Sequence, residues 1–243
     1  MPNKQRHRGA QPKDGQFFGG KWIPILNMAV EDMSWLMTRG YPRKSSLNLV
    51  GNRYRLNTRQ RHAVWRASCA DQDKDARNSK RIDVAELNQS PLVVDGYNLL
   101  ITVEAALAGG VILFCRDGAV RDIASIHGTY RKVEETLPAL DIIGNTLASI
   151  SNQDIHWFLD KPVSNSGRLK TLMGEVAREK SFRWNIDLVN NPDKAIVEEK
   201  EKVAISSDGW VLDEVDSWTN IHRYIVNKLP EVNKLELLGK SIF

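Results

Sequence analysis

Three aspartates, each at the end of an apolar run, are the first candidates for catalytic residues in this sequence. The run “PLVVD” ends at Asp95, “DIHWFLD” ends at Asp160, and “KVAISSD” ends at Asp208. Such runs are typical of buried strands, and the carboxyl ends of parallel strands meet at one edge of a sheet, where ligands bind. Carboxylates this close repel one another unless a cation lies among them, and oxygen ligands favour Mg²⁺ or Mn²⁺. The repeated pattern predicts a divalent metal site, although any one of these aspartates alone is more often a turn residue or a helix cap.

Two other polar segments follow predicted strands and supply supporting candidates. Asp193 lies in “NNPDKAIVE”, after the run “WNIDLV”, where it either adds a fourth carboxylate or caps a short helix over 192–200. Ser164 and Asn165 lie in “SNSG”, directly before a helical pattern. Backbone N–H groups at the start of a helix suit a phosphate, but capping alone explains these residues about as well.

A helical run over 124–150 carries a further group of candidates. His127, Arg131 and Glu134 are spaced to share one face of that helix. They supply either a further acid and a phosphate contact, or only a solvated face with a local ion pair.

The elements that must position these residues fall into two parts of opposite charge. Residues 1–90 contain 17 Lys and Arg against 8 Asp and Glu, whereas the rest of the chain contains 17 against 22. The differences, +9 and −5, sum to the net charge of +4. A basic part beside an acidic part indicates a polyanion-binding portion, although a basic surface that is merely solvated gives the same counts.

The basic part is predicted to be helical. Residues 1–20 show little periodicity and much Gly, Lys and Arg, which is typical of a flexible arm. Apolar spacing over 25–39 predicts a helix closed by Gly40. A second helix is expected to begin at Asn57 or at the next residue. On or beside it lie four candidate nucleic-acid-binding residues, to which Arg131 is added: Arg55, Arg59, His62 and Arg66.

Beyond the polar stretch 71–81, which reads as a linker or a solvated helix, strands and helices alternate. “VILFC” is a strand or half of a hairpin with “AVRDI”, and a last helix is expected to bury Trp218, Ile221 and Ile225. Repeated strand–helix units with apolar strands predict a parallel α/β sheet covered on both faces. The expected divisions are a flexible arm over 1–20, a basic helical domain over 21–85 and an α/β domain over 90–243.

Composition narrows the class of protein. No apolar run approaches the ~20 residues that span a bilayer, and the basic N-terminus is followed by no apolar signal core. The two cysteines, Cys69 and Cys115, form no CxxC pair, which favours reduced thiols and argues against zinc. We therefore expect a cytoplasmic protein that does not act in a membrane.

The ordered motifs resemble those of the PIN-like nuclease superfamily, especially its NYN branch. “VVDGYN” is similar to the first motif of that branch, and “WFLDKPVSNSG” to the second. “NNPDKAIVE” resembles the segment in which an aspartate opens a helix, and “AISSDGWVLD” resembles the terminal T/S-S-D motif. The whole chain further resembles a bacterial and archaeal family that joins a basic helical N-terminal domain of unknown function to a PIN-like domain.

The resemblance implies an α/β fold with a PIN-like (Rossmann-like) parallel sheet flanked by helices, and a small basic all-α N-terminal module. It implies that Asp95, Asp160 and Asp208 are catalytic ligands of Mg²⁺ or Mn²⁺, with Asp193 as a further ligand. Segment 109–150 is larger than the matching connection of a minimal member, which leaves the position of any acid from it open. The supporting residues are Asn98, Ser164, Asn165, Ser207 and Glu134.

The activity implied by the resemblance is metal-dependent hydrolysis of phosphodiester bonds, with RNA as the expected substrate. A haloacid-dehalogenase-like phosphatase also begins with a strand that ends in a nucleophilic Asp, and “SDGWVLD” is similar to its last motif. That class needs a second Asp two residues after the first, where this sequence has Tyr97. The alternative is a non-catalytic RNA-binding or ribosome-associated protein with the same fold. Oligomeric state does not follow from the sequence.

Overall fold

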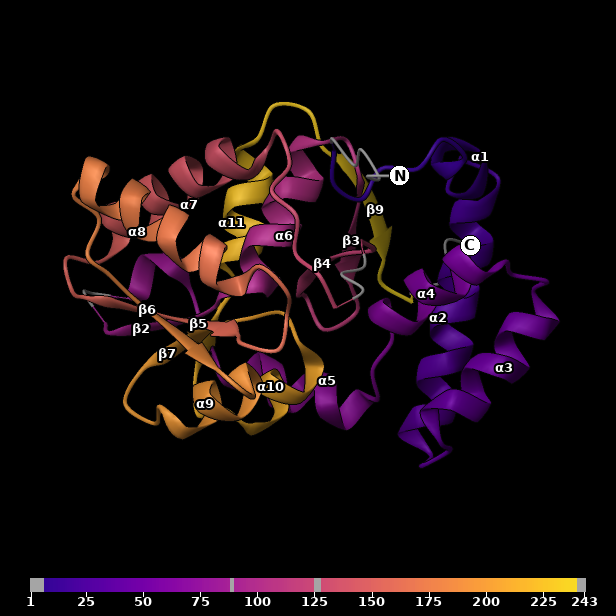
Figure 1. The fold of residues 1–243 in the computed structure, drawn as a ribbon. Helices are drawn as coiled ribbons and strands as arrows, with labels where there is room; N and C mark the ends of the chain where they lie inside the picture. Colours follow the sequence, from indigo (N-terminus) through magenta and orange to yellow (C-terminus); the bar gives the residue numbers. More distant parts are fainter. Residues whose placement is uncertain (1–6, 88–89, 125–127, 240–243) are drawn as a thin grey trace.

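A six-stranded parallel sheet forms the centre of the protein, whose computed structural model describes residues 7–87, 90–124 and 128–239 (Figure 1). Its order is β1-β8-β7-β2-β5-β6, and every neighbouring pair is parallel. The strands are β1 (Arg81–Ile82), β2 (Leu92–Asp95), β5 (Ile155–Asp160), β6 (Trp184–Val189), β7 (Val203–Ile205) and β8 (Trp218–Thr219). From β2 the chain winds outward through β5 and β6, and then returns to the other side of β2 through β7 and β8. The crevice between the carboxyl ends of β2 and β7 is therefore the switch point of the sheet, where ligands of such folds bind.

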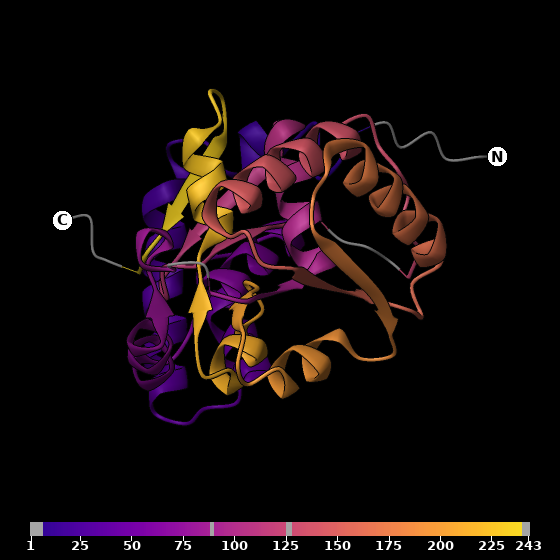
Figure 2. The same cartoon turned by 90° about the vertical axis from the view of Figure 1, so that its left-hand side faces the viewer.

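Helices cover both faces of this sheet (Figure 2). Such cover is needed because the strands are apolar at successive positions, whose side chains point to opposite faces. Leu92 and Val94 belong to one core and Val93 to another on the opposite face. The first face carries α6 (Gly96–Leu107), α7 (Thr136–Ile150), α8 (Ser166–Lys180) and α11 (Ile221–Lys228). The second face carries α9 (Pro192–Glu198) and α10 (Gly209–Glu214). The α/β class with helices on both faces is confirmed.

Among the residues that the structure describes, five helices precede the main sheet, and a short 3₁₀ turn, η1 (Val84–Glu86), lies between β1 and β2. They are α1 (Asp14–Phe17), α2 (Trp22–Thr38), α3 (Arg43–Arg53), α4 (Thr58–Ala67) and α5 (Asp71–Ser79). Helix α4 begins where the sequence predicts, because Asn57 and Gln60 form a reciprocal capping box. No helix among the described residues is long and apolar enough to cross a membrane.

A second, three-stranded sheet joins the N-terminal helices to the rest of the chain. Its order is β4-β3-β9, with β3 (Val111–Cys115) antiparallel to β4 (Val120–Asp122) and parallel to β9 (Asn233–Leu237). The hairpin of β3 and β4 was one of the two predicted alternatives. Leu113 and Leu235 of this sheet share one core with Leu26 and Val30 of α2. Among the described residues, α1 to α4 therefore have no separate core, and Figure 1 shows β3, β4 and β9 between these four helices and the main sheet.

Residues 7–20, expected to form a flexible arm, are packed against the rest of the chain. Arg8 is 2 % exposed, and its Nε donates to Glu104 Oε2 of α6 at 2.8 Å. Asp14 is also buried and accepts two hydrogen bonds from Arg59 of α4. These buried ion pairs order the segment, so the expectation is wrong for this part of the arm.

Two further predictions of local structure are corrected, and a third is decided between its two alternatives. The helix expected over 124–150 is α7 alone, which begins at Thr136, and the described residues before it are not helical. For the stretch 71–81 the structure decides between the two alternatives: it contains the helix α5, whose residues are exposed or half-buried except for Arg77, which is buried against the main domain. Trp218 lies in β8 and not on the last helix, because its indole Nε1 donates to the carbonyl of Arg77 at 2.7 Å.

Candidate functional site

Three of the predicted aspartates line one pocket of about 410 Å³ at the switch point of the sheet. We call it the carboxylate pocket. Asp95 ends β2, Asp208 caps α10 after β7, and Asp193 lies in the first turn of α9 after β6. The pocket is lined by His62, Arg66, Asp95, Tyr97, Asn98, Ile101, Asp122, Ala124, Asp193 and Asp208. Of the three aspartates that the strand pattern predicts to meet, Asp95 and Asp208 line this cavity, and the supporting acid Asp193 lines it in place of Asp160.

The carboxylate of Asp95 is held by two hydrogen bonds from different elements. Its Oδ1 accepts from the backbone N–H of Asn98 at 3.3 Å, which also caps α6. Its Oδ2 accepts from Ser206 Oγ at 2.8 Å. Ser206 Oγ in turn accepts from the N–H of Asp208 at 3.0 Å. The strand-end turn after β7 and the first turn of α6 are thereby fixed relative to each other.

The turn after β7 is also fixed through Ser207. Asn98 Oδ1 accepts from both the N–H and the Oγ of Ser207 at 2.9 Å. The carbonyl of Ser207 accepts from Arg121 Nε of β4 at 2.6 Å. The predicted supporting residues Asn98 and Ser207 therefore contact each other and position Asp208.

Burial and mutual repulsion raise the pKa values of the carboxylates. Burial, and then the charges of Asp193 and Asp208, raise the pKa of Asp95 to about 7, despite the opposing hydrogen bonds. Burial, and then Asp208 and Asp160, raise the pKa of Asp193 to about 6. Perturbed carboxylates that face one cleft are typical of functional sites, because a fold without a ligand gains nothing from their repulsion.

Asp160 lies at the same edge but does not line the carboxylate pocket. It ends β5, and its charge acts on Asp193 and on Tyr97. Among the described residues, neither Asp160 nor Asp193 has a side-chain hydrogen bond or an ion pair. Asp193 therefore raises the pKa of Asp95, whereas Asp160 is not among the charges that do so. The motifs imply the reverse, with Asp160 as a main ligand and Asp193 as a supporting one.

The donor set suits a hard divalent cation in its chemistry, since carboxylate oxygens are the ligands of Mg²⁺ and Mn²⁺. In the part of the chain that the structure describes, no three His, Cys, Asp or Glu side chains already converge on a single point as metal ligands. Two of the aspartates are free to turn, because Asp160 and Asp193 are half-buried and have no hydrogen-bonded partner among these residues. The chemistry of the donors therefore suits such a cation, whereas the present arrangement of the described side chains does not form a metal site.

The predicted nucleic-acid-binding residues of the N-terminal helices divide into two groups. His62 and Arg66 of α4 line the carboxylate pocket, and burial and then Arg66 lower the pKa of His62. Arg59 is used within the fold, because it pairs with Asp14 and donates to the carbonyl of Gly9. Arg55 is exposed after α3 and lines neither this pocket nor its neighbours. The prediction is therefore wrong for Arg59, whose guanidinium is not available to a ligand.

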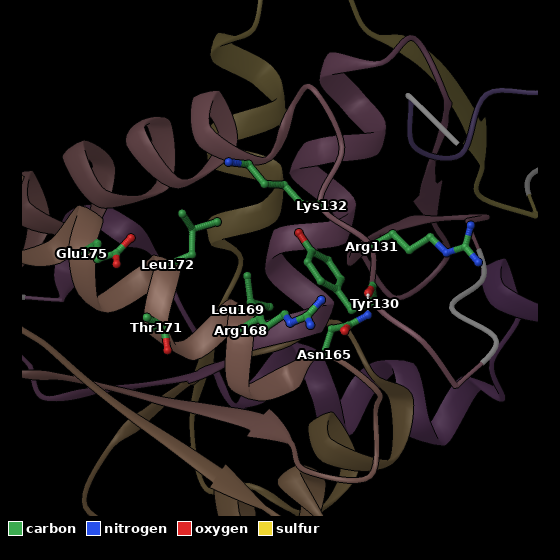
Figure 3. Close-up of a pocket in the computed structure, with 9 residues that line it drawn as sticks. All are labelled: Tyr130, Arg131, Lys132, Asn165, Arg168, Leu169, Thr171, Leu172 and Glu175. Atoms are coloured by element: carbon green, nitrogen blue, oxygen red, sulfur yellow. Dashed lines mark hydrogen bonds between the residues drawn. The ribbon is translucent and has the colours of Figure 1, made fainter. Parts of the chain in front are cut away.

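A second cavity, of about 560 Å³, lies beside α8 (Figure 3). Ser164 and Asn165 precede α8, and Asn165 Nδ2 donates to the carbonyl of Tyr130 at 2.9 Å. In Figure 3 the guanidinium of Arg131 points away from the side chains of α8. The cavity is lined by Tyr130, Arg131, Lys132, Asn165, Arg168, Leu169, Thr171, Leu172 and Glu175. It contains one carboxylate and three cations, so it lacks the cluster of acids on which the metal prediction depends.

Glu134 lies outside both cavities. It is exposed and belongs to no helix. Arg131 does not share a helix face with it, because the helix begins only at Thr136. His127 lies outside the described residues.

Sequence reasoning missed several residues that position the site. Ser206, the first serine of “ISSD”, donates to Asp95, whereas only Ser207 was predicted as a supporting residue. Arg121 holds the carbonyl of Ser207, and Asp122 joins the lining of the pocket. Both lie in “AVRDI”, whose two adjacent charges within an apolar strand are the one signal that could have indicated them.

Comparisons with known proteins identify relatives. The sequence model of a domain of unknown function, DUF5616, matches residues 84–224, and that of a protein of unknown function, DUF434, matches residues 25–80. An uncharacterized protein of Methanocaldococcus jannaschii, MJ0935, is 28% identical over 216 residues, which cover 89% of this chain and 99% of that protein. No solved structure matches the chain.

Proposed function

The chain belongs to the DUF5616 family of domains of unknown function, and we propose that its carboxylate pocket hydrolyses phosphodiester bonds of RNA with Mg²⁺ or Mn²⁺. The observation that carries this proposal is the pocket itself. Asp95, Asp193 and Asp208 reach it from three strand ends, and two of them have raised pKa values. Burial and then mutual repulsion raise those values, and a cation among the carboxylates would offset both.

The topology supports a PIN-like, and more generally Rossmann-like, assignment. Counted from β2, and with β1 at the edge beside β8, the strands of the main sheet lie in the order third, second, first, fourth and fifth. In doubly wound sheets of this order the ligand lies beyond the carboxyl ends of the first and fourth strands. Asp95 and the Ser206–Asp208 turn occupy those two ends.

The chemistry assigns each group in the pocket a separate role. A divalent ion held by the aspartates would offset charge on the phosphate and make a bound water more acidic. Asn98 and Ser206 hold the Asp95 carboxylate in one orientation through the hydrogen bonds to its two oxygens. Arg66 supplies a positive charge to the phosphate, and His62 is a neutral imidazole at pH 7 that can accept a proton from water.

RNA is the substrate suggested by the basic N-terminal half and by the resemblance to the NYN branch. Residues 1–90 carry a surplus of nine positive charges, and two of their side chains, His62 and Arg66, reach the carboxylate pocket. Binding through such charges is independent of sequence and weakens as salt is added. A protein that only binds RNA would use the same surface without the aspartates.

The test compares the wild-type protein with Asp95→Asn and Asp193→Asn on labelled single-stranded and hairpin RNA and DNA. We expect cleavage of RNA with Mn²⁺ or Mg²⁺, none with EDTA, and rates lower by on the order of 100-fold in both variants. Asp216→Asn, which removes an exposed carboxylate paired only with Lys200, is the matched control and should cleave normally. Binding of RNA that is equal in all four proteins, without metal-dependent cleavage, would replace the nuclease with an RNA-binding protein.

A further inference from the structure

A smaller cavity of about 210 Å³ adjoins the carboxylate pocket on the side of the N-terminal helices. We call it the basic cavity. The two cavities share the side chains of His62, Arg66, Asn98 and Asp208. Four arginines from four elements, α3, α4, α5 and β4, face the basic cavity. It is lined by Arg43, His62, Trp65, Arg66, Ser68, Arg77, Asn98, Arg121, Ser207, Asp208 and Gly209.

Two of these arginines are neutralised within the fold. Arg77 donates to Asp117 Oδ2 at 2.7 Å and to Asp213 at 2.7 and 2.8 Å. Arg121 donates to both oxygens of Asp117 at 2.9 and 2.7 Å. Since Asp117 is 1 % exposed and lies outside the cavity lining, these pairs belong to the structural core.

Arg43 lacks such compensation. Its Nη2 donates to the carbonyl of Trp65 at 2.6 Å, and its guanidinium lies 4.3 Å from the centre of the Trp65 ring system. Its Nε is buried and has no hydrogen-bond partner among the described residues. Burial, and then Arg121 and Arg77, lower its pKa, which is the response of a cation that is buried and also lies near other cations.

The neighbouring aspartate does not neutralise this surplus. Among the described residues Asp208 forms no ion pair, and its Oδ1 accepts from the N–H groups of Trp210 and Val211. Arg66 donates to the carbonyl of Asp122 at 3.0 Å and lies 4.0 Å from its carboxylate. The fold thus maintains a surplus of negative charge in one cavity and a surplus of positive charge in the adjoining one.

We propose that the basic cavity binds the terminal phosphate group of a nucleic-acid strand whose adjacent phosphodiester bond lies in the carboxylate pocket. The cavity is smaller than the roughly 300–1,000 Å³ of ordinary ligand pockets, so a phosphate group fits where a whole nucleotide does not. A terminal phosphate carries a charge of about −1.5 to −2, whereas an internal phosphate carries −1. The terminal group therefore balances the charge of several guanidinium groups better. Arg43 and Arg66 are the two that can turn their N–H groups to it, as planar donors suited to phosphate.

The inference that the phosphate belongs to a nucleic-acid strand rests on the proposed function, whereas the inference that the basic cavity binds an anion does not. The first experiment therefore measures inorganic phosphate alone, by calorimetry and by the shift of the unfolding temperature at low salt. We expect binding by the wild-type protein and by Asp95→Asn, and binding about tenfold weaker or lost in Arg43→Gln and in Arg66→Gln. The two arginine variants are independent, so a folding defect in one leaves the other as the test.

The chain offers a matched control for Arg43. Arg39 also lies over a tryptophan, 3.6 Å from the ring centre of Trp35, and donates to the carbonyl of that residue at 3.5 Å, but it is exposed. Arg39→Gln should bind phosphate as the wild type does. Arg168→Gln probes the cavity of Figure 3, which also has cations. Loss of phosphate binding in Arg168→Gln with full binding in Arg43→Gln would overturn the proposal, and so would an absence of binding in the wild type.

The second experiment compares short RNA strands that carry a 5′-phosphate, a 3′-phosphate or hydroxyl groups at both ends. We expect one phosphorylated end to strengthen binding about tenfold, and Arg43→Gln to remove that preference. Binding is measured on Asp95→Asn, so the result does not depend on cleavage. Equal binding of all three strands would refute the terminal-phosphate site even if the protein proves to be a nuclease. A preference in Asp95→Asn, together with an absence of metal-dependent cleavage by the wild type, would keep the site and refute the proposed activity.

Discussion

Asp95 is a buried carboxylate that, among the described residues, forms no ion pair with a cation. Burial, and then the charges of Asp193 and Asp208, raise its pKa to about 7 in the folded protein, from an ordinary value of 3.8. An acid whose folded pKa is raised stabilises the fold below its unfolded pKa, and that contribution is lost as the pH rises through the folded value. The free energy of unfolding should therefore fall between about pH 4 and pH 7, by about 4 kcal/mol at most from this group.

Asp95→Asn should remove this loss. At pH 8 without metal we expect the variant to be more stable than the wild type by about 1–4 kcal/mol, since Asn keeps an oxygen for the N–H of Asn98. Urea unfolding at pH 5 and pH 8 measures the difference. Added Mn²⁺ should stabilise the wild type and leave the variant unchanged. A variant less stable than the wild type at pH 8 would mean that the carboxylate is structural.

His222 gives the fold a second, opposite dependence on pH. It is fully buried on α11, and both ring nitrogens lack hydrogen-bond partners among the described residues. Burial, and then the charge of Arg121, lower its pKa from 6.5 to about 3. Its contribution to stability is present above pH 6.5 and is lost as the pH falls toward 3, at about 1.4 kcal/mol for each pH unit. We expect His222→Met to show a shallower loss of stability between pH 6 and pH 4, and an unchanged slope would contradict the assignment.

Single residues of the site were predictable where their chemistry repeats. Asp95 and Asp208 end apolar strands in the same way, and Asn98 and Ser207 follow or precede them in the chain. Arg43 and Arg121 were not predictable, because their roles depend on contacts with residues 22 and 86 positions away. Periodicity within one segment carries no information about such contacts.

At the scale of elements, α4 is the helix that brings His62 and Arg66 to the site, and its start depends on Asn57. The Asn57 side chain accepts from the N–H of Gln60 at 3.0 Å, and Gln60 Oε1 accepts from the N–H of Asn57 at 3.1 Å. Asn57→Ala should cost about 1 kcal/mol of stability. Chemical denaturation measures this, and Thr58→Ala at the exposed next position is the control with little expected effect. Equal losses in the two variants would show that the cap contributes nothing.

The elements were predictable where propensity and burial agree. Strands β2, β5 and β6 and helices α6 and α8 lie where apolar runs and helical spacing place them. Helix α3 was missed because it buries only Ser46, Val50 and Gly51, which give no apolar stripe. Strand β9 was missed because its alternation is short, and it is fixed by pairing with the distant β3. Tertiary contacts therefore decide the elements that sequence patterns leave open.

At the scale of the whole molecule, two matched sequence regions form one packed unit. The regions meet between residues 80 and 84, yet the helices before this point share a core with β3 and β9 beyond it. The carboxylate pocket and the basic cavity both take residues from the two sides. A fragment that begins at residue 84 would lack His62 and Arg66 and expose the apolar face of the second sheet. The site is therefore a property of the joined regions and not of either one.

Asp117 links the two matched regions through buried ion pairs with an arginine of each. It accepts from Arg77 of α5 and from Arg121 of β4, and although burial opposes its ionisation, Arg121 and Arg77 hold its pKa at about 2. Asp117→Asn would leave two buried guanidinium groups without their shared partner and should cost about 3–5 kcal/mol. Asp213→Asn, which removes the half-exposed partner of Arg77 alone, should cost about 1 kcal/mol.

Unfolding of the wild type and of these two variants by guanidinium, followed by tryptophan fluorescence and by circular dichroism, tests whether the two regions unfold as one unit. The two signals should change together in the wild type, because a shared core makes unfolding one cooperative transition. In Asp117→Asn we expect the midpoint to fall with the signals still coincident. Arg121 also holds the carbonyl of Ser207, so binding of terminal phosphate should weaken in this variant at temperatures where it is fully folded. Two separate transitions in the wild type would show instead that the helical region folds independently and meets the sheet only at its surface.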